Sequence, residues 1–380
     1  MFNIGIICEY NPFHNGHIYH INEIKKLYPD SRIILVMSGN FSQRGDVSLI
    51  NKWDKTEIAL NNNIDLVIEL PFVFATQGAD KFAHGAIQIL DNLKVDKLIF
   101  GSECNDITYL TNLAKIQINN KKYDELVKKY MDKGMNYPTA MSKALKECNG
   151  NTIENPNDIL GLCYIKEIIK MNSKIEPITI KRTNNYHDKK TTNNICSATA
   201  IRELIKNNDS INNFVPYDTI KYINKNCSID NYYKFLQYKI MTCKNIEEYE
   251  TVDENIKYRI IKYITTCNNL EELINKIKTK RYTYNRIKRM LLHILCDFTK
   301  EENKKCNDIH YIRILGFNNI GRNYLNSIKK NAKIPIISNF SSMKDIMLDI
   351  EFRSTCIYSL VFKNNQEIIS SEYKNKPIIK

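Results

Sequence analysis

Residues suited to binding phosphate are concentrated in one short stretch near the start of the chain. His14, His17 and His20 are three of the seven histidines, and imidazole N–H groups can donate hydrogen bonds to phosphate oxygens. Gly16 lies between the first two and permits a close backbone approach. An apolar run at residues 4–8 precedes this stretch and apolar residues at helical spacing follow it, which predicts a turn between a strand and a helix. The free N–H groups at the start of that helix would complete a phosphate site at the edge of a sheet.

Two sequence signatures resemble those of a known superfamily. Residues 9–17 read Glu-Tyr-Asn-Pro-Phe-His-Asn-Gly-His. The His-x-Gly-His end resembles the signature of the nucleotidylyltransferase superfamily, which shares its site with class I aminoacyl-tRNA synthetases. The longer run resembles the opening of the bacterial tRNA(Met) cytidine acetate ligase family. Residues 195–202 resemble the second superfamily signature, Ile-Ser-Ser-Thr-x-Ile-Arg: Thr199 and Arg202 match it, while Ala198 replaces a serine. Two signatures in this order are more specific than either one.

Strand-like and helix-like segments alternate through the first half of the chain. After the first strand, apolar runs occur at residues 32–37, 66–70, 97–100 and 175–180. This alternation predicts an α/β fold with a Rossmann-like parallel sheet. We assign it to a nucleotidyltransferase domain at residues 1–207.

Polar residues follow several of these strands, at the edge where open α/β folds bind ligands. Gly39 and Asn40 follow the second strand and are a candidate ligand pocket. Gly101 ends the fourth strand and would let a nucleotide approach the backbone, and Glu103 after it could meet the ribose or base. Arg182 follows the fifth strand, and its guanidinium could bind two phosphate oxygens at once.

Two predicted helix starts are further candidates for phosphate binding. Asn157 or Asp158 could be a simple N-cap, and the resemblance makes Asn157 a nucleotide-site residue; the two roles are compatible. Ser197 or Thr199 is expected to cap a second helix, whose N-terminus could hold phosphate. A polar loop at residues 186–194 precedes that helix.

The resemblance implies a set of ATP-binding residues and a catalytic subset of it. His14, His17 and Arg182 are implied to be catalytic, by stabilising charge that develops on the phosphates. No metal ligands are assigned: Mg²⁺ is expected with ATP, and the histidines lack a clearly placed partner for zinc. The ATP-binding residues implied by the resemblance are Ile7, Cys8, Glu9, Tyr10, Asn11, Pro12, Phe13, His14, Asn15, Gly16, His17, His20, Gly101, Asn157, Arg182, Ser197 and Thr199.

The positive charge is concentrated in the last third of the chain. Residues 1–100 carry 9 Lys and Arg against 11 Asp and Glu, whereas residues 251–380 carry 24 against 13. A near-neutral half joined to a basic half suggests a small-molecule site next to a polyanion-binding surface, although general solubility charge is the alternative.

Residues 208–380 are predicted to form a mainly helical, basic RNA-binding domain. Strand-like runs at residues 311–315, 334–337 and 356–361 suggest a small closing sheet. The densest basic segment, residues 276–289, holds seven cations and two tyrosines. Such a segment could neutralise phosphates and stack exposed bases, or could be a solvated helix face. The predicted tRNA-binding residues are Lys280, Arg281, Tyr282, Tyr284, Arg286, Lys288 and Arg289.

By the resemblance, the function is ATP-dependent acetylation of the wobble cytidine of elongator tRNA(Met), with acetate bound beside Gly39 and Asn40 and activated as acetyladenylate. One alternative is a nucleotidylyltransferase that adenylylates a small phosphorylated cofactor precursor, which would not need the basic last third. The other is a non-catalytic RNA-binding protein, which the intact His-x-Gly-His disfavours.

The remaining composition predicts a cytoplasmic protein. Eleven cysteines include no Cys-x-x-Cys pair, so we expect them to be reduced and not to bind metal. No apolar run approaches the ~20 residues of a membrane span, and no signal-peptide pattern is present. We expect neither a membrane nor DNA as a partner.

Overall fold

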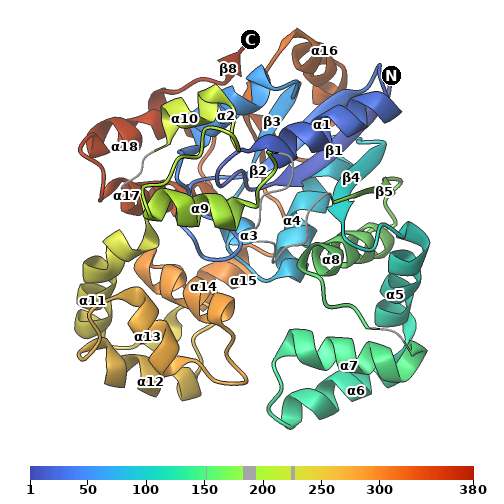
Figure 1. The fold of residues 1–380 in the computed structure, drawn as a ribbon. Coiled ribbons are helices and arrows are strands. Elements are labelled where there is room, and N and C mark those ends of the chain that lie inside the picture. The colour runs from blue at the N-terminus through green and yellow to red at the C-terminus, as the bar shows by residue number, and fades with distance from the viewer. Residues whose placement is uncertain (151, 183–193, 224–226) are drawn as a thin grey trace.

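A computed structural model describes the chain except for residue 151 and residues 183–193 and 224–226. Within the described residues, an eight-stranded sheet has the order β5-β4-β1-β2-β3-β6-β7, with β8 beside β6 (Figure 1). The five strands of the first half run parallel to one another. They are β1 (Asn3–Cys8), β2 (Arg32–Ser38), β3 (Leu66–Leu70), β4 (Lys97–Ser102) and β5 (Glu176–Lys181). The predicted α/β class with a Rossmann-like parallel sheet is confirmed.

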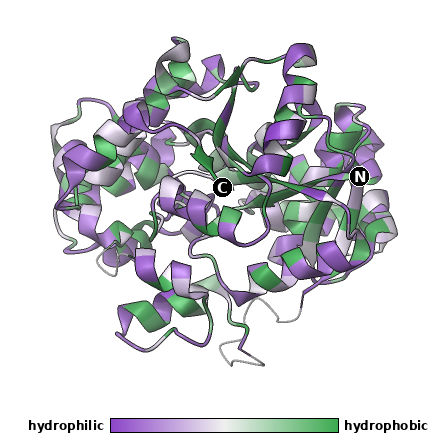
Figure 2. Cartoon of the chain, turned by 90° about the horizontal axis from the view of Figure 1, so that it is seen from above, coloured by the Kyte–Doolittle hydropathy of each residue, from purple (hydrophilic) through white to green (hydrophobic). Residues whose placement is uncertain are grey.

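The central parallel strands are buried because helices cover both faces of the sheet, whereas the edge strand β5 is partly exposed. In β2, every residue after Arg32 is buried, and β3 is buried throughout. Continuous apolar runs of this kind are typical of parallel strands covered on both sides. Figure 2 shows hydrophobic residues along the central strands and hydrophilic residues on the outer surfaces of the surrounding helices. The helices of the first half are α1 (Asn15–Leu27), α2 (Lys52–Asn61), α3 (Phe72–Ala75), α4 (Ala79–Asn92), α5 (Ile107–Asn119), α6 (Lys121–Asp132), α7 (Tyr137–Asn149), α8 (Pro156–Lys170) and α9 (Ala198–Lys206).

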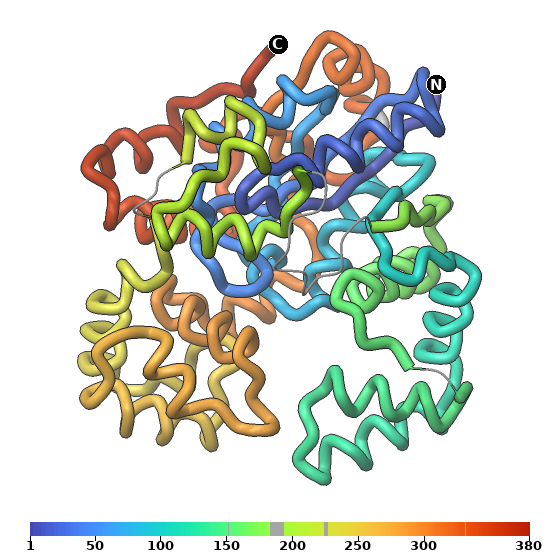
Figure 3. Tube along the Cα trace, in the orientation of Figure 1, coloured from blue at the N-terminus to red at the C-terminus, as the bar shows by residue number. Residues whose placement is uncertain are grey.

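The second half is mainly helical, as predicted. Helices α11 to α14 pack together into a unit that projects from the body of the molecule, opposite the end where both chain termini lie (Figures 1 and 3). The helices are α10 (Tyr217–Tyr222), α11 (Tyr233–Thr242), α12 (Glu254–Ile264), α13 (Leu270–Ile277), α14 (Tyr284–Leu295), α15 (Lys300–Lys305), α16 (Asn319–Ile328), α17 (Ile346–Ser359) and α18 (Asn365–Lys374). Short 3-10 helices are η1 (Ile229–Tyr232), η2 (Ile246–Glu248), η3 (Lys329–Asn331) and η4 (Phe340–Ser342). None of the helices in the described part of the chain is long and apolar enough to cross a membrane.

The strands of the last third extend the main sheet rather than forming a separate one. They are β6 (Ile312–Phe317), β7 (Ile336–Ile337) and β8 (Ile378–Ile379). β6 pairs antiparallel with β3, and β7 and β8 pair parallel with β6. The strand predicted at residues 356–361 is wrong, because these residues fall at the end of α17 and just beyond it. The buried residues Met347, Ile350, Ser354 and Tyr358 have helical spacing, and this period outweighs the local strand propensity.

A buried network of charges attaches the last third to the sheet. Lys52 of α2 lies 2.6 Å from Glu69 of β3, 2.5 Å from Glu372 of α18 and 3.1 Å from Glu351 of α17. Arg313 of β6 lies 2.9 Å from Glu69 and 2.7 Å from Glu372. All five side chains are at most 2% exposed. Five elements from both ends of the chain thus share one set of ion pairs.

Candidate active site

The strand order brings the main predicted site residues to one edge of the sheet. β1 lies between β2 and β4, so the strand order reverses beside β1. In open α/β sheets, ligands bind at such reversal points, beyond the carboxyl ends of the strands. His14 follows β1, Gly101 lies near the end of β4, and Arg182 comes directly after β5.

Two histidines cap the N-terminus of α1 reciprocally. His14 is the N-cap, and its Nδ1 accepts the backbone N–H of Gly16 at 3.0 Å. Nδ1 of His17 accepts the backbone N–H of His14 at 3.1 Å, and the two ring centroids are 3.8 Å apart. A Cβ atom on Gly16 would lie 2.8 Å from the His14 ring. Glycine at this position therefore lets the His14 ring fold over the start of the helix.

These hydrogen bonds determine which ring nitrogen carries the proton. A nitrogen that accepts a hydrogen bond has a lone pair, so the neutral His14 and His17 rings are protonated on Nε2. Within the described residues, no hydrogen bond from either Nε2 to a protein acceptor is seen. Both rings can therefore offer an Nε2–H donor to a bound anion, from the same helix N-terminus.

Burial keeps the site histidines neutral. Burial, with the nearby cations Arg182 and Arg202, lowers the pKa of His14 to about 3. Burial and Arg182 lower the pKa of His20 to about 4. Burial and the neighbouring histidines hold the pKa of His17 well below its usual value. At neutral pH the positive charge of the site is therefore carried by arginines, and the histidines are uncharged donors.

The two sequence signatures meet at Arg202. One of its guanidinium nitrogens donates to the carbonyl oxygen of Asn11 at 2.7 Å, and the other donates to Thr199 Oγ1 at 3.2 Å. Ser197 is the N-cap of α9, and its Oγ accepts the N–H of Ala200 at 3.2 Å. The N-cap expected at Ser197 or Thr199 is thus Ser197, and a second helix N-terminus lies beside the first.

Arg182 lies beside Gly101 near the end of β4 and beside Glu103 in the loop that follows. Glu103 Oε1 lies 4.0 Å from Nε of Arg182 and accepts the side-chain amide of Asn157 at 2.5 Å. A Cβ atom on Gly101 would lie 3.2 Å from the Arg182 side chain, so glycine leaves room for the guanidinium across the end of β4. The N-cap of α8 is Asn155, which leaves Asn157 facing Glu103.

Several residues that the resemblance assigns to ATP have side chains engaged within the protein. The Asn11 amide bonds two backbone groups in the segment after β2. The Asn15 amide donates to two carbonyl oxygens, one before α9 and one after it. Tyr10 and Phe13 are 1% and 0% exposed and pack edge to face. These four side chains shape the turn, so contact with a nucleotide would come from the backbone around them.

The candidate acetate residues lie buried at the end of β2. The Asn40 amide donates to Thr355 Oγ1 at 3.2 Å and accepts the backbone N–H of Lys52 at 3.0 Å. The carbonyl oxygen of Gly39 accepts Nζ of Lys55 at 2.7 Å. Because these bonds occupy the Asn40 side chain, an anion at this position would have to meet backbone groups.

Comparison with known proteins gives the family. A model of the HIGH nucleotidyl transferase family matches residues 1–372, which include both signatures. The chain belongs to the HIGH nucleotidyltransferase family.

Within this family, the chain is similar to enzymes of one kind along its full length. It is 39% identical to a tRNA(Met) cytidine acetate ligase of Caldicellulosiruptor saccharolyticus, over 98% of each protein. It is 37% identical to the protein of the same name from Geobacillus, over 99% of each. Among solved structures, apo TmcAL of Thermotoga maritima matches with a TM-score of 0.92 at 32% identity, over 100% of this chain and 99% of that one. A second crystal form of that protein, bound with alpha-thio ATP, matches with a TM-score of 0.89 and the same coverage.

The predicted RNA-binding residues of this HIGH nucleotidyltransferase differ in exposure. Lys280 and Arg281 are exposed in the loop before α14, and Arg286 is half-buried. Tyr282 is only 3% exposed, and its hydroxyl donates to Asp253. Its ring, expected to stack on a base, is part of the core instead, and the Arg286 guanidinium lies 4.9 Å from the ring centroid.

Sequence reasoning left one side chain that organises the site without a role. Arg202 matched the second signature, and its spacing of three residues from Thr199 on a helix is the signal for their contact. Glu103 was expected to meet the ribose or base of a nucleotide, but its contact with Arg182 was not foreseen, because Arg182 follows a distant strand. The polar loop predicted before α9 lies mostly outside the described residues.

All eleven cysteines are free. In the described part of the chain, no group of three or more His, Cys, Asp or Glu is arranged to hold a metal ion.

Proposed function

We propose that this protein is an ATP-dependent ligase that acetylates the wobble cytidine of elongator tRNA(Met), forming N4-acetylcytidine. The observation that carries the proposal is the convergence of anion-binding groups at the ends of β1, β4 and β5. Two neutral histidines present Nε2–H groups, Arg182 and Arg202 supply the charge, and two helix N-termini point at one edge of the sheet. A nucleoside triphosphate matches this chemistry.

The reaction takes place in two steps. An acetate oxygen attacks the α-phosphorus of ATP, the bond from that phosphorus to the bridging oxygen breaks, and pyrophosphate leaves. The cytidine amine then attacks the acetyl carbonyl of acetyladenylate, AMP leaves with the bonding electrons, and the amine loses a proton. His14 and His17 would stabilise the charge that develops on the phosphates, with Arg182 assisting. One positioned donor of this kind is typically worth ~10²–10³ in rate.

No enzyme nucleophile is needed, and the cysteine in the site is unsuited to be one. Burial raises the pKa of the Cys8 thiol to about 12. The thiol is therefore protonated at neutral pH, and the thiolate is the reactive form. The acyl group would pass directly from acetyladenylate to the amine.

Acetate and magnesium are assigned from the chemistry of neighbouring groups. Acetate would be placed at the backbone of Gly39 and Asn40, beside the phosphate site. The carboxylates of Glu9 and Glu103 are bonded within the protein. Mg²⁺ carried by ATP would therefore be coordinated by phosphate oxygens and water, as is common for this ion.

The exposed cations before α14 would bind the tRNA. Lys280 and Arg281 are solvent-exposed, and cations at such positions bind phosphates at a salt-dependent strength. The half-buried Tyr284 and Arg286 would add contacts at the start of α14.

The test is transfer of radiolabelled acetate to total bacterial tRNA, with and without ATP, followed by nucleoside analysis. ATP-dependent label in N4-acetylcytidine is the expected result. Acetate-dependent exchange between ATP and pyrophosphate without labelled RNA would indicate acyl activation with a different acceptor. Absence of both reactions would overturn the proposal.

A further inference from the structure

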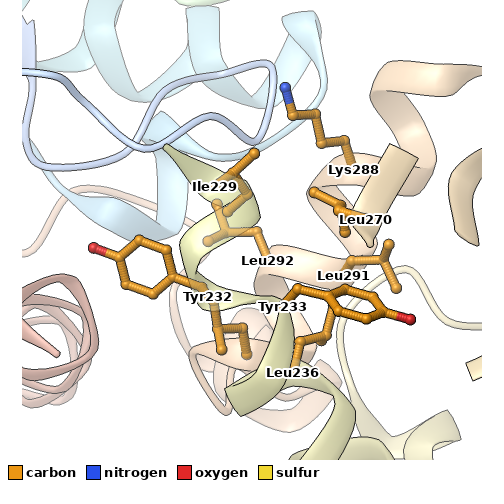
Figure 4. A pocket seen from close by; sticks show the side chains of 9 residues that line it. Ile229, Tyr232, Tyr233, Leu236, Leu270, Lys288, Leu291 and Leu292 are labelled. Carbon is orange, nitrogen blue, oxygen red and sulfur yellow. The ribbon is translucent and has the colours of Figure 1, made fainter. Parts of the chain in front are cut away.

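Lys288 connects the helical unit α11–α14 to the loop that follows β2. The aliphatic part of its side chain lines a small apolar gap with Tyr232, Leu291 and Leu292, and its ammonium points away from that gap (Figure 4). The gap measures about 10 Å³, which is too small for any ligand larger than a water molecule. The ammonium forms an ion pair with Asp46.

The ion pair is largely shielded from solvent. The Lys288 side chain is 12% exposed and that of Asp46 is 17% exposed. An ion pair at this depth differs from a surface pair, because removing one partner leaves the other charge poorly solvated. Lys288 is therefore committed to a protein partner and is not a free cation of the basic segment.

The neighbouring residues of α14 contact the same loop. Arg289 donates to the carbonyl oxygen of Gln43 at 3.3 Å. Burial lowers the pKa of Arg289 to about 10, so it stays charged at neutral pH. Gly45 has a φ of +76°, and a Cβ atom there would lie 2.7 Å from the backbone nitrogen of Arg289. The backbones of the loop and the helix thus lie in direct contact, at a position where only glycine fits.

The loop in turn contacts the phosphate-binding stretch. The backbone N–H of Gln43 donates to Glu9 Oε1 at 2.5 Å. The Asn11 amide accepts the N–H of Leu49 at 2.9 Å and donates to the carbonyl oxygen of Val47 at 3.2 Å. Hydrogen bonds therefore lead from α14 through the loop to residues that lie immediately before His14.

We infer that Lys288 and Arg289 are positioning residues for acetate activation rather than RNA ligands. They hold the loop at residues 39–49 against the Glu9–His17 stretch, so that a contact from the helical unit sets the geometry of the nucleotide and acetate site. The inference rests on the proposed function. It implies that the helical unit is needed for the first chemical step, before any RNA is bound.

The test compares Lys288→Met with Lys239→Met, which controls for the loss of a lysine from an ion pair of the same helical unit, although that pair is more exposed, at 33% and 47%. Lys239 of α11 forms a 2.7 Å ion pair with Asp297, just beyond the end of α14, and within the described residues no ion pair joins either residue to the loop at residues 39–49. The assay is acetate-dependent ATP–pyrophosphate exchange in the absence of RNA. A small displacement of reacting groups can cost up to ~10²-fold in rate, so we expect Lys288→Met and Asp46→Asn to lower exchange by about 10- to 100-fold. Lys239→Met should leave it unchanged.

Two further measurements separate positioning from a folding defect or RNA binding. Amide hydrogen exchange at residues 42–46 should become faster in Lys288→Met and stay unchanged in Lys239→Met. The swapped pair, Asp46→Lys with Lys288→Asp, should recover part of the lost exchange activity. Unchanged activation with a raised KM for tRNA in Lys288→Met would overturn the inference and make Lys288 an RNA ligand. If the wild-type protein shows no acyl activation, the proposed function fails. Independently of that result, unchanged hydrogen exchange at residues 42–46 in Lys288→Met would overturn the positioning role.

Discussion

Nδ1 of His17 accepts the backbone N–H of His14 at 3.1 Å. The same two histidines therefore cap the start of α1 and offer hydrogen-bond donors to a phosphate. The capping role and the donor role use different ring nitrogens. Sequence changes at His17 can therefore separate them.

Substitution of His17 by Asn should remove the phosphate donor and keep the cap. The Asn oxygen can accept the His14 N–H, but it has no group in the place of Nε2–H. We expect acetate-dependent ATP–pyrophosphate exchange to fall by ~10²–10³-fold, with little change in the free energy of unfolding. His17→Ala should lose the cap as well, at a cost of ~1 kcal/mol. Equal activity of wild-type protein and His17→Asn would contradict the role of Nε2–H.

The buried histidines should make the protein less stable in mild acid. Burial and Arg182 lower the pKa of His20 to about 4, whereas the unfolded chain has an ordinary histidine pKa of ~6.5. Below that pH the unfolded state binds more protons, so stability is fully present above ~6.5 and falls toward the folded pKa. Urea unfolding between pH 5 and 7 should show a shallower pH dependence in His20→Gln, by up to ~1.4 kcal/mol per pH unit. The same slope in both proteins would show that His20 titrates normally.

Asp158 should be essential for the loop that holds Arg182. Its buried carboxylate accepts the Ser102 hydroxyl at 2.5 Å, the N–H of Glu103 at 2.9 Å and the N–H of Cys104 at 3.1 Å. Hydrogen bonds to a charged acceptor contribute ~1.5–3 kcal/mol each. We expect Asp158→Asn to lower the free energy of unfolding by ~2 kcal/mol and to raise the KM for ATP. Unchanged ATP kinetics would mean that this loop does not position the nucleotide.

The strands of the first half could be predicted from the sequence, and so could the convergence of the candidate site residues at one edge of the sheet. The strand expected at residues 66–70 is β3 without any shift, because a short apolar run bounded by polar residues and proline leaves little freedom. Parallel strands place their carboxyl ends at one edge, so residues after β1, β4 and β5 had to converge. His14, Gly101 and Arg182 lie together for that reason.

Contacts that depend on distant segments could not be predicted. The antiparallel pairing of β6 with β3 joins residues 312–317 to residues 66–70, and nothing in either run indicates the other. Lys288 is one of seven cations in the basic segment at residues 276–289. Nothing in the sequence distinguishes it from its neighbours or indicates that Asp46 is its partner. The bond from the Tyr282 hydroxyl to Asp253, 29 residues earlier in the chain, is another contact of this kind.

Removal of Lys52 should destabilise the attachment of the last third to the sheet. Lys52→Met leaves Glu69 and Glu372 paired with Arg313, whereas the carboxylate of Glu351 loses its ion-pair partner Lys52. Breaking a buried ion pair in this way typically costs ~3–5 kcal/mol. Urea unfolding should show a loss of that size, and Lys52→Met combined with Glu351→Gln should be more stable than Lys52→Met alone. A double variant no more stable than the single one would contradict the argument.

The same network predicts a pH effect with a defined sign. Burial and the neighbouring Glu69 raise the pKa of Glu351 above its usual value. The stabilisation from its protonated form is fully present below the unfolded pKa of ~4.3 and is lost as the pH rises through the folded pKa. The stability lost in Lys52→Met should therefore be smaller at pH 5 than at pH 8. An equal loss at both pH values would show that Glu351 does not take up the proton.

Lys280 and Arg281 should bind tRNA through phosphates. Replacing both by Met should raise the KM for tRNA in the acetyl-transfer reaction, because two exposed cations are lost. For contacts to single strands, the dependence of log K on log salt should become shallower by ~1.4. Lys304→Met with Lys305→Met removes two cations of α15, also exposed, and should leave both quantities unchanged. If the two double variants change tRNA binding equally, Lys280 and Arg281 act only through the overall positive field of the protein. Direct phosphate contacts would make the effect larger at Lys280 and Arg281 than at Lys304 and Lys305.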